Sequence, residues 1–146
     1  MYKRQELDLP LIENAKMQAS FVGMDFSTSL KPDEFLYEET KLSLGRSELE
    51  FLFTPGHTPG EFCIYIPEIN SCITGDVLFN ESIGRTDLWG GNYDTLIESI
   101  NNKLLTLPDE TKIFPGHGES STIGSCLLYT SPSPRDRTRS RMPSSA

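Results

Sequence analysis

A chain of 146 residues is long enough to bury one hydrophobic core, so a single domain is expected. Its 21 acidic residues outnumber 13 basic ones, and the formal charge of −8 argues against nucleic acid as a main partner, because phosphate backbones would be repelled. No apolar run approaches the roughly 20 residues that cross a bilayer, and no signal-peptide pattern opens the chain, so no membrane partner is predicted.

The first predicted element is an amphipathic helix. Pro10 suits its first turn and Gly23 suits its end. Between them, apolar residues recur at spacings of three and four: Leu11, Ile12, Ala15, Ala19 and Val22.

A two-residue periodicity then predicts β-structure. Leu42 and Leu44 precede a Gly45-Arg46 turn, and Leu49, Phe51 and Phe53 alternate with their neighbours, which indicates a β-hairpin. Alternation over 62–66 predicts another strand, and the apolar run 72–74 predicts a third, which leads directly into Gly75-Asp76.

The next predicted helix begins after Asn92, which is placed to cap it, and carries the apolar stripe Tyr93, Leu96, Ile97, Ile100 and Leu104. Residues 112–114 predict a strand that leads to Pro115-Gly116-His117-Gly118. Strands with intervening helices are typical of an α/β layer structure.

The composition changes after Gly124, where Ser, Pro and Arg dominate. We therefore divide the chain into a folded part, 1–125, and a disordered, non-native tail, 126–146. The alternative is a basic tail that binds RNA or a protein. Without the tail, the chain has 9 basic and 20 acidic residues, a formal charge of −11.

Cys63, Cys72 and Cys126 lack CxxC spacing, so neither a disulfide framework nor a zinc knuckle is indicated. Cys63 and Cys72 lie among apolar residues of predicted strands. We expect them to be buried, reduced thiols, which suits a cytoplasmic protein.

The two histidines of the chain share one setting. His57 and His117 each follow Pro-Gly at the end of a predicted strand, where loops commonly carry binding groups. A metal ligand must present a ring nitrogen at about 2.0 Å with little freedom, and tight turns through Pro and Gly can aim it. Asp76 lies between them in the sequence, after an apolar run where an unpaired charge would be costly without a cation. The residues thus predict a metal site.

Four motifs, in order, carry a family resemblance: Thr54-Pro55-Gly56-His57-Thr58-Pro59-Gly60, Gly75-Asp76-Val77-Leu78-Phe79, Ser82-Ile83-Gly84-Arg85-Thr86-Asp87, and Pro115-Gly116-His117-Gly118 with Thr122-Ile123-Gly124. From about Leu7 to Gly124 the chain resembles the C-terminal half of the metallo-β-lactamase superfamily, and within it the glyoxalase II (hydroxyacylglutathione hydrolase) group. This implies part of an αββα sandwich.

The resemblance also implies a site. His57 would bind a first metal, Asp76 would bridge two metals as both ligand and catalytic residue, and His117 would bind the second. Two Zn²⁺ ions are implied for an intact domain, with Fe or Mn as alternatives. The pair would lower the pKa of a shared water and polarise the carbonyl of a small-molecule thioester, such as a glutathione conjugate.

Part of the family pattern is absent. The H-x-H-x-D-H segment, which supplies the main ligand cluster, has no counterpart in this sequence. The remaining half-sandwich should expose an unpaired edge and an uncovered apolar face. The three surviving ligands could hold a single ion, but the family divides them between two metals, so we expect this polypeptide to be weakly active or inactive.

Two further readings stay open: an iron persulfide dioxygenase on the same scaffold, and a non-catalytic fragment or binding module. Arg85 and Asp87 are expected to form a structural ion pair near the site, with substrate contact as the alternative. Trp89 and Tyr93 could line a pocket, although packing roles are favoured.

Overall fold

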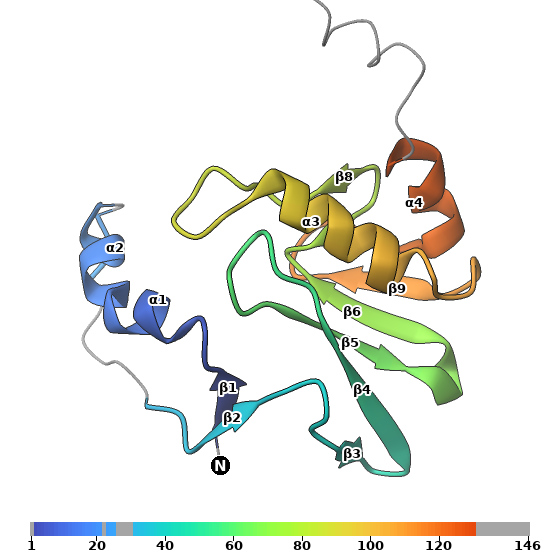
Figure 1. Cartoon of the computed structure of the whole chain (residues 1–146), viewed down its shortest axis with the longest axis horizontal. Coiled ribbons are helices and arrows are strands. Elements are labelled where there is room, and N and C mark those ends of the chain that lie inside the picture. The colour runs from blue at the N-terminus through green and yellow to red at the C-terminus, as the bar shows by residue number, and fades with distance from the viewer. Residues whose placement is uncertain (1, 22, 26–30, 131–146) are drawn as a thin grey trace, which may run out of the picture.

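The computed structural model of the chain describes residues 2–21, 23–25 and 31–130. Its main feature is a six-stranded sheet with the strand order β10-β9-β6-β5-β4-β3 (Figure 1). Three strands, β4, β6 and β9, run in the same direction, because β5 is antiparallel to both β4 and β6, and β6 is parallel to β9. The strands are β3 Leu42–Leu44, β4 Ser47–Phe53, β5 Phe62–Ile66, β6 Ser71–Gly75, β9 Lys112–Pro115 and β10 Ser121–Thr122.

The predicted hairpin is confirmed. Strands β3 and β4 pair with Leu44 opposite Ser47, which leaves Gly45-Arg46 as a two-residue turn. Gly45 has a φ of 66°, a left-handed conformation that glycine adopts without steric cost. The predicted strands over 62–66, 72–74 and 112–114 correspond to β5, β6 and β9.

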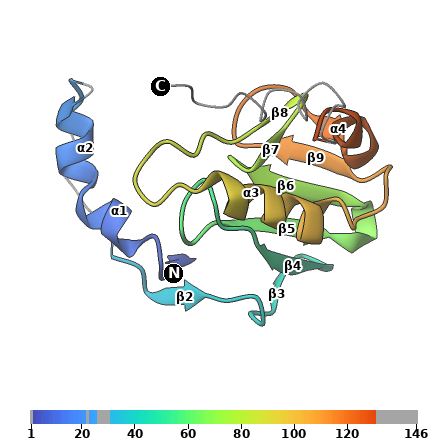
Figure 2. The ribbon, with the colours of Figure 1, turned by 45° about the horizontal axis from the view of Figure 1, so that its top comes forward.

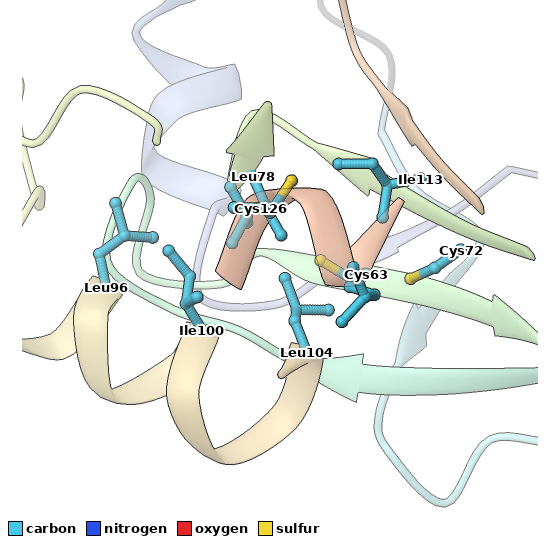
Figure 3. Close-up of a cluster of buried hydrophobic side chains, with 10 residues drawn as sticks. Cys63, Cys72, Leu78, Leu96, Ile100, Leu104, Ile113 and Cys126 are labelled. Carbon is cyan, nitrogen blue, oxygen red and sulfur yellow. The ribbon is translucent and has the colours of Figure 1, made fainter. Parts of the chain in front are cut away.

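One face of the sheet is covered by helix α3 (Tyr93–Ser99) and the π-helical turn η2 (Ile100–Leu104), which continues it. Asn92 caps α3 by accepting the amide of Thr95 at 2.9 Å, as predicted. Three members of the predicted stripe pack inward (Figure 3), whereas Tyr93 is 59% exposed and Ile97 is outside the buried cluster. The three join one core with residues of the sheet and of the segments that follow β6 and β10: Leu96, Ile100, Leu104, Cys63, Cys72, Val77, Leu78, Ile113, Ile123 and Cys126.

The two central cysteines are buried and outside any disulfide, as expected. Cys63 and Cys72 are both 0% exposed. Thr54 Oγ1 donates to Cys63 Sγ at 3.3 Å. Burial raises the pKa of the Cys63 thiol well above its ordinary value, because a thiolate would lose its hydration there.

The opposite face of the sheet carries exposed apolar side chains. Ile73 and Phe114 are neighbours across the β6-β9 ladder and are 45% and 44% exposed. Because side chains alternate along a strand, they point away from the core that their neighbours Cys72 and Ile113 join. This agrees with the expectation of an uncovered apolar face.

The predicted N-terminal helix is two helices. Helix α1 (Leu9–Glu13) ends at Asn14, whose backbone and side-chain amides both donate to the carbonyl of Pro10, and α2 (Ala15–Phe21) follows at once. The side-chain amide thus competes with the backbone for the last carbonyls of α1. Both views show this pair extending away from the sheet (Figures 1 and 2). Val22 of the predicted stripe lies outside the described residues.

Several short elements lack a clear sequence pattern. Strands β1 and β2 form a parallel pair, and β7 and β8 form an antiparallel pair directly after β6. Their bounds are β1 Lys3–Gln5, β2 Glu34–Leu36, η1 Pro67–Ile69, β7 Leu78–Phe79 and β8 Ser82–Ile83.

Helix α4 (Ile123–Thr130) crosses the predicted boundary between residues 125 and 126. Ile123 and Cys126 are 0% and 1% exposed and belong to the core, so burial of this apolar face continues the fold past residue 125. Residues 131–146 lie outside the described residues. Within the described part, no helix combines the length and apolar character that a membrane crossing requires.

Candidate metal centre

The three predicted ligands follow the carboxyl ends of three strands that point the same way. His57 lies in the loop after β4, Asp76 directly after β6, and His117 two residues after the end of β9. Because β4, β6 and β9 are co-directional, these ends meet at one edge of the sheet. Binding groups in open α/β sheets commonly gather at such an edge. The topology therefore brings together residues that are up to 60 positions apart in the sequence.

The carboxylate of Asp76 lies between the two imidazoles. Its Oδ2 is 3.8 Å from His57 Nε2, and its Oδ1 is 3.7 Å from His117 Nε2. The two rings therefore approach different oxygens of one carboxylate. This is the arrangement in which a carboxylate can bridge two cations, each with one imidazole.

The side chains fit divalent cations in two respects. Asp76 Oδ1 is buried and makes no hydrogen bond to any described residue, which is costly unless a cation or water satisfies it. In addition, two ligand atoms about 2.1 Å from a tetrahedral zinc ion lie about 3.4 Å apart, and the observed separations of 3.7 and 3.8 Å are close to this.

The number of ligands per ion is low. In the part of the chain described by the structure, no three His, Cys, Asp or Glu side chains form a group that could hold one ion. The single-ion His-His-Asp alternative is thus not the arrangement observed. Each oxygen of Asp76 has one imidazole beside it, so each cation would receive two ligands from these residues.

The ring of His57 is oriented by the backbone. Its Nδ1 lies 2.7 Å from the carbonyl oxygen of Arg85, a contact that requires Nδ1 to carry the proton and donate it. In the neutral ring, the lone pair is then on Nε2, the nitrogen that faces Asp76. A hydrogen bond of this kind fixes the tautomer and the orientation of a metal-binding histidine.

Two glycines allow the loops to approach Asp76 closely. A Cβ on Gly84 would lie 1.9 Å from the carbonyl oxygen of Asp76, and a Cβ on Gly116 would lie 2.7 Å from Asp76 Oδ1. No other residue type fits at either position without displacing the carboxylate or its backbone. The Gly residues of the motifs therefore serve close packing at this edge.

The three predicted ligands line a cleft of about 460 Å³, within the size range of small-molecule sites. The Phe79 ring packs on the His117 ring, with centroids 4.6 Å apart. The remaining lining residues come from the β7-β8 hairpin, the segment after it and the loop after β9: Asn80, Ser82, Ile83, Gly84, Arg85, Gly118 and Glu119.

The expected ion pair of Arg85 and Asp87 is confirmed. Arg85 Nε donates to Asp87 Oδ1 and a terminal guanidinium nitrogen donates to Oδ2, both at 2.8 Å. This bidentate bond lowers the pKa of Asp87 to about 2. Because Arg85 also supplies the carbonyl that orients His57, the pair holds a segment in contact with the site.

Trp89 and Tyr93 behave differently from the expectation of packing roles. They are 60% and 59% exposed, and neither lines the cleft. Both belong to the segment in which Gly90 contacts Pro59 and α3 begins. The position of Trp89 and Tyr93 near the start of a helix was therefore not enough to predict whether their side chains face the core.

Sequence reasoning missed two carboxylates that support the site. Glu61 Oε1 accepts the backbone amide of Asp76 at 3.0 Å, and burial raises the pKa of Glu61. Asp8 is 5% exposed and accepts the Gly60 amide at 2.7 Å and the Thr58 hydroxyl at 2.9 Å. The partners of each carboxylate lie 15 to 52 residues away, so no local pattern could reveal them.

Comparison with known proteins gives consistent matches. The family model described as the metallo-beta-lactamase superfamily matches residues 2–117. A probable metallo-hydrolase of Bacillus subtilis, YqgX, is 39% identical over 130 residues, covering 82% of this chain and 62% of that protein. The hydroxyacylglutathione hydrolase GloC of Haemophilus influenzae is 42% identical over 120 residues, covering 82% and 57%. The chain thus spans less than two thirds of the length of these relatives.

Solved structures agree. BLEG-1, a B3 metallo-beta-lactamase, superposes with a TM-score of 0.79 at 34% identity, covering 88% of this chain and 63% of that one. TTHA1623, crystallised in a di-iron-bound form, superposes with a TM-score of 0.78 at 38% identity, covering 89% and 63%. Together with the site geometry, these matches show that the chain belongs to the metallo-β-lactamase superfamily, with a relationship to the glyoxalase II group.

Proposed function

We propose that His57, Asp76 and His117 hold two divalent cations, with Asp76 bridging them, in a protein that hydrolyses a small-molecule thioester of the hydroxyacyl-glutathione type. The observation that carries this proposal is the position of the Asp76 carboxylate, with a different imidazole nitrogen beside each oxygen. The related YqgX is a probable metallo-hydrolase and the related GloC a hydroxyacylglutathione hydrolase, which supports a metal-dependent hydrolase.

Bound divalent cations lower the pKa of a coordinated water toward neutrality and polarise a carbonyl oxygen, which is the chemistry that acyl hydrolysis requires. In this proposal, the residues of the chain would position the cations. Asp76 would supply one oxygen to each cation. Its buried Oδ1, which has no hydrogen-bond donor among the described residues, would then have a cation as its partner. The Arg85 carbonyl would keep His57 Nε2 directed at the site through the proton on Nδ1.

The substrate class follows from the relationship to GloC and from the cleft. A volume of about 460 Å³ suits a small molecule. The acidic composition still disfavours nucleic acid, and the buried thiols Cys63 and Cys72 are compatible with the cytoplasmic location that we propose.

Zinc is the metal that we propose, because imidazole and carboxylate are its common ligands. The di-iron-bound relative makes iron the specific alternative. Metal analysis distinguishes them: two zinc ions per complete site support the hydrolase, whereas a single iron would favour the dioxygenase alternative.

Because a catalytic zinc usually has three protein ligands, two ligands per cation predict weak binding by this chain alone. We therefore expect the chain to bind metal detectably at high concentration and to turn over thioester slowly or not at all. Ligands beyond those of the described residues would be needed for full activity.

The test is a titration of the metal-free chain with Zn²⁺ and Co²⁺. Calorimetry measures the binding of both ions, and visible absorption measures the binding of Co²⁺. Asp76→Asn should weaken binding by more than about 10-fold, because it removes the shared carboxylate. Asp109→Asn makes the same chemical change in the exposed loop before β9 and should leave binding unchanged. Equal affinities in the two variants would contradict the proposed site.

A further inference from the structure

The backbone of Asp76 is held by a side chain from another strand. Glu61 Oε1 accepts the Asp76 amide at 3.0 Å. Glu61 directly precedes β5 and Asp76 directly follows β6, and because these strands are antiparallel, the two residues lie side by side at the sheet edge. Glu61 is itself anchored, since its carbonyl accepts the Thr54 amide at 2.9 Å.

The sheet provides no partner for this amide. The β6-β9 ladder changes register between Ile73 and Gly75, so regular pairing ends just before Asp76. The neighbouring amides are satisfied elsewhere: Val77 donates to the Thr74 carbonyl, and Gly116 donates to the Gly75 carbonyl. The Glu61 carboxylate thus supplies the bond that the irregular strand end cannot.

Gly75 makes room for this contact. Its φ is +51°, and a Cβ there would lie 2.9 Å from Glu61 Oε1. The glycine therefore allows both the turn of the chain and the approach of the carboxylate. The second oxygen, Glu61 Oε2, is buried and makes no hydrogen bond to a described residue, so among these residues the hydrogen bond of the carboxylate is the one from the Asp76 amide.

We propose that Glu61 is a positioning residue that fixes Asp76 between the two imidazoles and thereby raises the affinity of the site for divalent cations. The proposal rests on the function proposed above, because it assigns Asp76 as the shared ligand. Mutating a residue that holds a metal ligand in place typically changes metal affinity by about 10- to 100-fold.

Two substitutions separate positioning from charge. Glu61→Gln removes the negative charge and keeps a carbonyl oxygen that can accept the Asp76 amide, whereas Glu61→Ala removes the acceptor. Glu38→Ala is a matched control, because Glu38 Oε1 also accepts a backbone amide, that of Phe53 at 2.9 Å, without contacting Asp76.

The first measurement needs no metal. In the metal-free chain, hydrogen exchange of the Asp76 amide is followed by NMR. We expect Glu61→Ala to accelerate it at least about 10-fold, while Glu61→Gln and Glu38→Ala leave it within about 3-fold of the wild type. Unchanged exchange in Glu61→Ala would overturn the positioning role.

The second measurement is cobalt titration of the same proteins. We expect Glu61→Ala to weaken Co²⁺ binding by about 10- to 100-fold and Glu61→Gln by less than about 3-fold. Equal weakening in both variants would assign the effect to charge and refute the proposal. A wild-type chain that binds no Co²⁺ would instead contradict the proposed function. The hydrogen-exchange experiment would still test the contact between Glu61 and the Asp76 amide. If Glu61→Ala fails to fold, Glu61→Asp takes its place with the same expectations, because its carboxylate is one methylene too short.

Discussion

Gly56 allows the loop that carries His57 to pack directly on helix α3. Its φ is +136°, a conformation that side chains rarely adopt, and a Cβ there would lie 2.4 Å from both the N and Cα atoms of Leu96. The Asn92 amide also donates to the Gly56 carbonyl at 2.8 Å. Gly56→Ala should therefore force the loop and the first turn of α3 apart.

The loss can be estimated from two contributions. A non-glycine residue at such a φ costs about 1 to 3 kcal/mol of backbone strain. Overpacking against rigid backbone costs about 1 to 3 kcal/mol more. Gly56→Ala should thus lower the free energy of unfolding by about 2 to 6 kcal/mol, a large part of the stability of a typical domain.

Gly45→Ala is the matched control. Gly45 also has a positive φ, +66°, but nothing lies within 4 Å of its added Cβ, so only strain of about 1 to 2 kcal/mol is expected. Both variants are compared with the wild type by urea unfolding followed by circular dichroism. A Gly56→Ala chain that fails to fold beside a folded Gly45→Ala chain also agrees with the estimate. Equal losses in the two variants would refute the steric argument.

Three further predictions follow from individual contacts. Asn92→Ala should cost about 1 kcal/mol in urea unfolding, because it removes the cap on the Thr95 amide, and an unchanged midpoint would argue against that cap. Cys63 should react with a thiol reagent at pH 8 only after denaturant is added, because its raised pKa and burial keep it protonated and inaccessible; reaction in the native chain would contradict this. Arg85→Ala should raise the pKa of Asp87 from about 2 toward an ordinary aspartate value, measured by NMR titration of the side-chain carboxyl carbon. Because the pKa is lowered, the ion pair stabilises the fold at pH values above the unfolded-state pKa of Asp87, and this stabilisation is lost as the pH falls toward 2. An unchanged Asp87 titration in the variant would exclude the guanidinium as the cause of the lowered pKa.

The strands and the main helix could be predicted because their patterns are local. The alternation over 49–53 indicates a strand that buries one face. The capping residue Asn92 and the apolar stripe that includes Leu96 indicate a helix in the same way. The split of the first helix at Asn14 and the continuation of α4 beyond residue 125 were not predicted. The split depends on the Asn14 side-chain amide, which competes with the backbone for the Pro10 carbonyl. The continuation of α4 depends on its packing against core residues that are distant in the sequence.

The sequence alone determined which residues could coordinate a metal, since His57, Asp76 and His117 stand out by their motifs and by following strands. Only the tertiary structure decided that three co-directional strands end together, that one carboxylate faces two imidazoles, and that Glu61 and Asp8 support the loops from behind. The physical reason is that a motif records local backbone geometry, whereas a distance between side chains far apart in the chain depends on sheet order and register.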